Sequence, residues 1–146
     1  MMRRIFSLFI LFLLVVVLLG TACNGKDDNE YIQNITFSTE LNNMIPEGVT
    51  DEFNADVSII YCTFDLTEKV EETSEITILW IYIYQENGNR TEYLVENWTE
   101  KAAGNDRMSM FIYQPVKGWP LGDWRADLYI DGQAITSAPF KVKMGF

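Results

Sequence analysis

The main part of the chain alternates apolar and polar residues with a period of two, the pattern of strands half buried in a sheet. Residues 122–130 show it most clearly: each even position from Trp124 to Ile130 is apolar, while Arg125 and Asp127 lie on the opposite face. Asp-Gly at 131–132 then predicts a two-residue turn of type I′, which needs positive φ at both positions. No stretch after the N-terminal segment has the spacing of an amphipathic helix of about ten residues, so the body is predicted to be all-β.

About seven runs rich in β-branched and aromatic residues are predicted as strands. They cover residues 32–37, 57–64, 76–84, 91–98, 107–113, 122–130 and 134–142. A long loop is expected over 42–54 and a turn at 87–89. The run 76–84 is the most apolar and is predicted to be central, whereas Pro139 lacks a ladder N–H and suggests an edge or a bulge. Strands at this spacing in about 115 residues predict an antiparallel β-sandwich, with a closed barrel as the alternative.

Composition excludes several classes of function. The 146 residues suffice for one domain. The absence of histidine removes Ser-His-Asp triads, Cys-His pairs and histidine metal sites, and two cysteines are too few for a four-cysteine zinc site. The net charge of −10 argues against nucleic-acid binding, which needs clustered lysine and arginine. We therefore expect no metal, no cofactor and no nucleic-acid partner.

The N-terminus has the layout of a secretory signal peptide. Arg3 and Arg4 precede an apolar run over 5–19, and small residues follow at 20–22. A transmembrane anchor is the alternative, but it needs about 20 apolar residues, and this run is shorter.

Residues 19–23, Leu-Gly-Thr-Ala-Cys, resemble a bacterial lipobox. The resemblance implies that the signal peptide is cut before Cys23 and that Cys23 becomes a diacylglyceryl cysteine carrying fatty acids such as palmitate. Two acyl chains anchor a protein stably, so the resemblance implies a lipoprotein on the extracytoplasmic side of the cell membrane or the outer membrane. Gly20 stands where leucine is commonest. In some Gram-negative bacteria an aspartate directly after the cysteine marks inner-membrane retention. Asn24 occupies that position here, which favours the outer membrane for a Gram-negative source. A chance cysteine after a plain secretory signal is the alternative.

These predictions divide the chain into a signal peptide (1–22), a lipidated cysteine with a polar tether (23–30) and one domain (31–146). Of the 11 basic residues, loss of Arg3 and Arg4 leaves 9 against 21 acidic ones, a net charge of −12. Anionic lipid repels such a charge, so the membrane is expected to be a partner only through the lipid anchor.

The C-terminal part of the sequence resembles the closing hairpin of bacterial extracytoplasmic immunoglobulin-like domains. Their pattern is Pro-x-x-Gly-Trp-Pro-x-Gly-x-Tyr, an alternating strand, Asp/Asn-Gly and a final Phe-x-Val, and residues 113–142 follow it well. Trp124 stands where tyrosine is usual, and Trp80 stands where such domains often have a strand tryptophan. The resemblance covers 56–142 loosely. It implies an immunoglobulin-like β-sandwich and leaves the function open, because sandwiches host many activities.

Aromatic side chains are the candidate ligand contacts. Trp80, Tyr82 and Tyr84 share one face of their strand, and the other face is apolar too. Burial on both sides explains this pattern, and an open aromatic face for sugar or peptide is the alternative. Trp119 is interpreted as a plug at the end of the sandwich, with a platform for ligand stacking as the alternative. Trp119, Tyr82 and Tyr84 are therefore the possible ligand contacts.

Reactive groups are few. Cys62 lies mid-strand among apolar residues and is interpreted as buried. Asp127 lies beside Arg125 on a polar face, while Asp123 and Asp131 belong to turns, so no pair of acids is placed for glycoside hydrolysis. The chain is not expected to be an enzyme, and a hydrolase that uses Asp127 is an alternative from a different class.

The sequence thus predicts a lipid-anchored extracytoplasmic binding or accessory module that displays an immunoglobulin-like domain to an envelope protein or a glycan. The alternative is a structural or assembly subunit of a cell-envelope complex.

Overall fold

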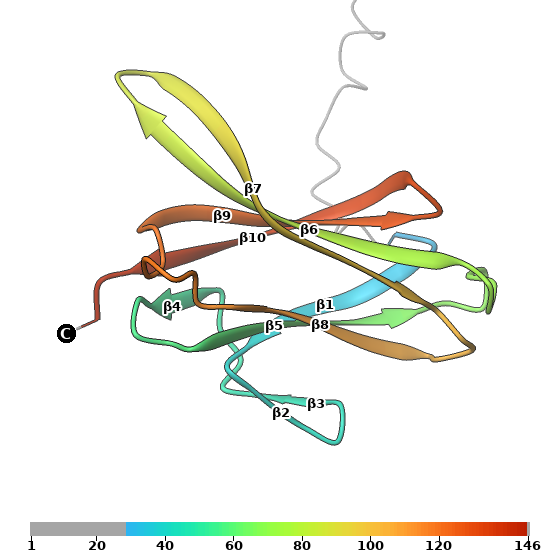
Figure 1. Ribbon diagram of the computed structural model, residues 1–146. Coiled ribbons are helices and arrows are strands. Elements are labelled where there is room, and N and C mark those ends of the chain that lie inside the picture. Colours follow the sequence, from blue (N-terminus) through green and yellow to red (C-terminus); the bar gives the residue numbers. More distant parts are fainter. Residues whose placement is uncertain (1–28, 146) are drawn as a thin grey trace, which may run out of the picture.

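The computed structural model describes residues 29–145, which form two facing sheets and a small hairpin (Figure 1). The strands are β1 (Ile32–Ser38), β2 (Glu40–Asn42), β3 (Ile45–Glu47), β4 (Glu52–Asn54), β5 (Ile59–Leu66), β6 (Glu75–Glu86), β7 (Asn89–Lys101), β8 (Arg107–Tyr113), β9 (Gly122–Ile130) and β10 (Gln133–Lys143). One sheet has the order β1-β5-β8 and the other the order β4-β10-β9-β6-β7, while β2 and β3 pair only with each other. This arrangement confirms the predicted all-β sandwich.

The number of strands differs from the prediction. The described residues form ten strands instead of about seven, because the expected loop over 42–54 contains β3 and β4, and β2 ends at its first residue; each of the three is three residues long. Strands this short show no alternation that a sequence can reveal. Their partners also hide them, since β4 pairs in parallel with the distant end of β10, from Lys141 to Lys143. Before Lys141 no strand of residues 29–145 pairs with the outer side of β10, which is where Pro139 lies.

Aromatic rings from both sheets meet in the core. Trp124 stacks on Phe140 with ring centroids 5.8 Å apart, and Trp80 meets Phe140 edge-on at 6.0 Å. Phe37 approaches Phe140 from the facing sheet at 4.9 Å. The indole N–H of Trp80 is buried without a hydrogen-bond partner among residues 29–145. Leaving such a donor unpaired costs about 1–3 kcal/mol, which burial of the large ring offsets.

Strand β6 is an interior strand of the five-stranded sheet, with β9 on one side and the edge strand β7 on the other, but the central position predicted for it belongs to β9. The core face of β6 carries Ile76, Ile78 and Trp80, all fully buried. Its outer face is only partly covered: Ile81 is 7% exposed and lies opposite Arg125 of β9, while Ile83 is half-buried. The predicted burial of both faces therefore holds for the core face of β6, whereas the outer face is buried only at Ile81.

The turn after β9 also holds the start of β6. Asp131 and Gly132 have φ of 50° and 80°, as the type I′ turn requires. The Asp131 carboxylate accepts hydrogen bonds from Ser74 Oγ and from the backbone N–H of Glu75, both at 2.9 Å. One residue therefore closes the β9–β10 hairpin and aligns β6 beside it.

We expect Asp131→Ala to lower the free energy of unfolding by about 1–3 kcal/mol, because it removes both acceptors and places alanine at a positive φ. Asp131→Asn keeps a carbonyl acceptor and tolerates this backbone conformation, so its loss is expected to be clearly smaller. Urea unfolding of both variants measures the difference. Equal stabilities of the two variants would contradict this role of Asp131.

Candidate binding surface

The hairpin of β6 and β7 projects beyond the rest of the five-stranded sheet (Figure 1). β6 pairs with β9 only from Ile76 to Ile83, but with β7 along its whole length to Glu86. The tip at Asn87 and Gly88 has positive φ at both residues, which closes the hairpin tightly. The projecting part is therefore supported by a single neighbouring strand and is open on both faces.

Tyrosines occupy the inner face of this hairpin. Tyr82 is half-buried: its hydroxyl donates to the Leu121 carbonyl at 3.0 Å, and its ring lies 5.3 Å from Trp124. Tyr93 of β7 stacks on Tyr82 at 6.4 Å and is exposed, as is Tyr84. Of the two candidate contacts on β6, Tyr84 is thus exposed to solvent and Tyr82 supports the base of the hairpin.

Trp119 lies elsewhere and presents little surface. It is 5% exposed, its indole N–H donates to the Val57 carbonyl at 2.6 Å, and its ring meets Trp124 edge-on at 5.5 Å. Its position matches a plug at the end of the sandwich and leaves no open ring face on which a ligand could stack.

A groove of about 340 Å³ runs between β7 and β8, the edge strands of the two sheets. Trp98 reaches across from β7 to Phe111 of β8, with ring centroids 6.2 Å apart, although Trp98 stays 54% exposed. Tyr113 packs against Phe111 at 5.2 Å and is 66% exposed. The other lining residues are Val95 and Glu96 of β7, Ile112 of β8, and residues 114–116.

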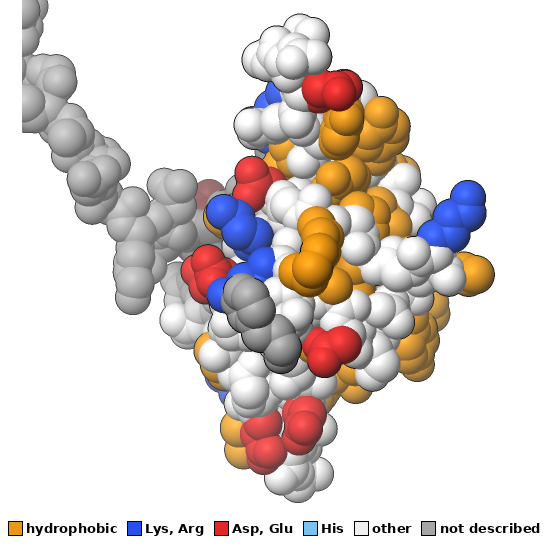
Figure 2. Space-filling model, turned by 90° about the vertical axis from the view of Figure 1, so that its left-hand side faces the viewer, with side chains coloured by type: hydrophobic (Ala, Val, Ile, Leu, Met, Phe, Trp, Pro, Cys, Tyr) orange, Lys and Arg blue, Asp and Glu red, His pale blue; other side chains and the backbone are white. Residues whose placement is uncertain are grey.

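The groove forms part of a larger exposed apolar surface. Figure 2 views the end where the hairpin tip lies and shows hydrophobic side chains in a band that descends from the hairpin. Tyr93 and Val116 are among the exposed apolar side chains of this region. Exposed apolar surface of this kind is typical of sites that contact a partner.

Sequence reasoning did not find the groove, because its two walls come from different sheets. The one local signal was Trp98 itself, a large apolar side chain between Asn97 and Thr99 in a strand of mostly polar residues. All thirteen residues of β7 are exposed, so no periodic burial marked the strand.

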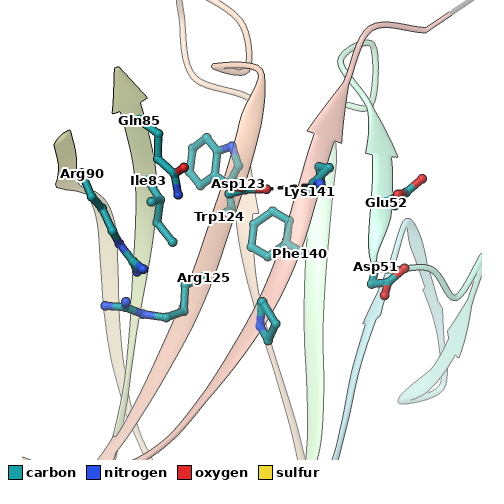
Figure 3. Close-up of a pocket in the computed structure, with 11 residues that line it drawn as sticks. Asp51, Glu52, Ile83, Gln85, Arg90, Asp123, Trp124, Arg125, Phe140 and Lys141 are labelled. Carbon is teal, nitrogen blue, oxygen red and sulfur yellow. Dashed lines mark ion pairs between the residues drawn. The ribbon is translucent and has the colours of Figure 1, made fainter. Parts of the chain in front are cut away.

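A second, shallower hollow of about 470 Å³ lies on the outer face of the five-stranded sheet (Figure 3). Arg90, Arg125 and Lys141 line it together with acidic side chains. Lys141 pairs with Asp123 at 3.4 Å, and Figure 3 marks this ion pair. Arg90 pairs with Glu92 at 2.8 Å. Because each cation has a carboxylate partner, this hollow has no concentrated positive field for an anionic ligand.

Arg125 ties the projecting hairpin to the body of the sheet. Its Nε donates to Asp127 at 2.6 Å, while Nη1 and Nη2 donate to the two carboxylate oxygens of Glu92 on β7, both at 3.0 Å. Asp127 and then Glu92 raise the pKa of Arg125, and hydrogen bonding to Arg125 lowers the pKa of Glu92. Ser137 Oγ also donates to Asp127, at 2.7 Å. Asp127 and Arg125 therefore lie side by side, as predicted, and in this fold they connect β9 to β7 through Glu92.

The other reactive groups are placed as follows. Cys62 is buried, as predicted, and burial raises the pKa of its thiol. Within residues 29–145 no cluster of acidic or cysteine side chains could hold a metal ion, and no helix is long and apolar enough to cross a membrane. The predicted signal peptide, Cys23 and most of the predicted tether lie outside the described residues.

No family model and no curated protein matches the chain. Several solved structures are similar to it, among them two bacterial proteins. An immunoglobulin-like protein from Pseudomonas aeruginosa is 18% identical with a TM-score of 0.50, over 77% of this chain and 91% of that one. The alkylpurine DNA glycosylase AlkC from Pseudomonas fluorescens is 10% identical with a TM-score of 0.43, over 77% of this chain and 30% of that one, which is too distant for any argument. The first likeness confirms an immunoglobulin-like fold and shows nothing of function.

We expect Glu92→Gln to loosen the projecting hairpin, because glutamine loses the charge that Arg125 holds. The pKa of Glu92 is lowered in the folded protein, so its contribution is present above the unfolded value of about 4.3 and is lost as the pH falls through the lowered value. Amide hydrogen exchange over residues 82–93, corrected for intrinsic rates, should be faster than in the native protein at pH 6, and the difference should shrink as the pH falls through the lowered pKa of Glu92.

Glu100→Gln is the matched control, since Glu100 lies on the same strand and makes no ion pair with another described residue. Equal exchange in the native protein and Glu92→Gln at pH 6 would show that Arg125 does not hold the hairpin.

Proposed function

We propose that the chain is a lipid-anchored, extracytoplasmic module of the cell envelope, which uses its immunoglobulin-like domain to bind a partner protein or glycan. The observation that carries the proposal concerns the exposed apolar surface that includes the groove. This surface extends to the end of the domain opposite the start of the described chain. Lipid anchoring rests on the lipobox resemblance at Cys23, and partner binding rests on the exposed surface.

The start of the described chain is held at one end of the sandwich. Asn29 Nδ2 donates to the Ile135 carbonyl at 2.8 Å, and the Glu30 carbonyl accepts from Thr67 Oγ1 at 2.6 Å. This is the end at which Asp131 holds the start of β6. A tether that precedes Asn29 therefore joins the domain at this end.

The hairpin tip lies at the other end of β6. The strand has 12 residues, and at about 3.3 Å per residue it spans roughly 35–40 Å. An anchor at Cys23 would thus leave the tip of the hairpin and the adjoining part of the exposed apolar surface directed away from the lipid. Such an arrangement suits display to a partner.

We expect labelled palmitate to be incorporated into the native protein, and Cys23→Ala to abolish both the labelling and membrane retention. The reason is that two acyl chains hold the protein in the membrane, whereas the negative charge of the domain is repelled by anionic lipid. Metabolic labelling and membrane fractionation of producing cells measure both effects. Cys62→Ala is the matched control and should keep the label. Labelling that survives Cys23→Ala would contradict the anchoring half of the proposal.

We expect cross-linking of intact producing cells, followed by capture of the tagged protein, to yield a defined envelope component. One dominant protein that stays associated through purification would indicate the alternative role, an assembly or structural subunit of an envelope complex. A glycan or an exchangeable protein would support display. No specific adduct from intact cells would contradict the binding half of the proposal.

A further inference from the structure

We propose that the groove between β7 and β8 binds an extended polypeptide segment of a partner, with apolar side chains at alternate positions and a lysine or arginine that pairs with Glu96. This inference rests on the proposed function and names the class of its ligand. Its argument uses the two free sheet edges, the aromatic lining and the charge of the groove.

Both walls of the groove are free sheet edges. β7 pairs only with β6, and β8 pairs only with β5, so each strand has one side without a neighbour among residues 29–145. A free edge presents a row of unpaired N–H and C=O groups, to which an extended chain can add as a further strand. A glycan has no such ladder to offer.

The side chains of the groove suit alternate apolar residues. Trp98, Phe111, Tyr113 and Val116 line the groove, and the ring of Phe111 lies beside the rings of both Trp98 and Tyr113. In an added strand every second side chain points to the same face, so alternate apolar residues would lie against these rings. Tryptophan and tyrosine are frequent among the few interface residues that supply most of the binding energy.

The charge of the groove selects a basic segment. Glu96 is the one charged residue that lines it, and no lysine or arginine does. The Glu96 carboxylate accepts a hydrogen bond from the N–H of Asn97 but makes no ion pair with another described residue. Trp80, which Glu96 faces across the ladder, is fully buried and offers it no cation. A cation must therefore come from the ligand.

Two other occupants are disfavoured. A second copy of the chain would bring its own β7, on which Glu96 and Glu100 form no ion pair with a described residue, to a protein of net charge −10. The chain's own tether precedes β1, which lies at the edge of its sheet farthest from β8.

Selection of phage-displayed random decapeptides on the full chain, purified in detergent and immobilised, tests the proposal. Trp98→Ala serves for counter-selection. We expect enriched peptides to alternate apolar and polar residues and to contain lysine or arginine. Their affinity for Trp98→Ala should fall at least about tenfold, as for a central aromatic contact. Glu96→Gln should weaken them several-fold at low salt and less at high salt.

Leu94→Ala is the matched control, because Leu94 is equally exposed on β7 but lies on the opposite face, beside Ile81. Its peptide affinity should equal that of the native protein, and thermal unfolding checks that all three variants fold. No enrichment over Trp98→Ala, enriched peptides without a basic residue, or equal losses in Trp98→Ala and Leu94→Ala would each overturn the proposal. Because the selection uses neither lipid nor cells, its failure is distinct from a failure of palmitate labelling or of cross-linking in cells.

Discussion

The backbone ladder of β6 is the interaction on which the rest of the structure depends. Where β6 has a neighbour on both sides, from Ile76 to Ile83, its inner face buries Ile76, Ile78 and Trp80 in the core. Beyond Ile83 only β7 remains beside it, and the same strand becomes a projecting hairpin. One long strand therefore builds both the most buried and the most exposed parts of the molecule.

Polar contacts connect the two ends of this strand to the body. Asp131 accepts from Ser74 and Glu75 where β6 begins, and Arg125 bridges Asp127 and Glu92 near its far end. Both use carboxylates that a sequence search for catalytic acids would single out. In this fold their hydrogen bonds hold strands in register, which shows why carboxylate spacing alone is weak evidence for hydrolysis.

Alternation of apolar and polar residues along each strand made much of the fold predictable. Strands β8 and β9 were predicted with their observed bounds, and the Asp131 turn with its backbone conformation. The three short strands were missed, because three residues carry too little pattern and β4 depends on a partner almost ninety residues away. Of the candidate contacts, Tyr84 is exposed, Tyr82 is half-buried and Trp119 is buried, a difference set by the neighbours of each ring.

The sequence by itself determined the all-β class, the faces of the strands and the lipobox resemblance at Cys23, since these depend on residues close together in the chain. Only the tertiary structure decided which strands become edges and which aromatic side chains remain in solvent. Trp98 and Phe111 lie thirteen positions apart in different sheets, and their approach across the groove depends on how the two sheets face each other. Burial and edge exposure are properties of the packed sheets, which local alternation does not encode.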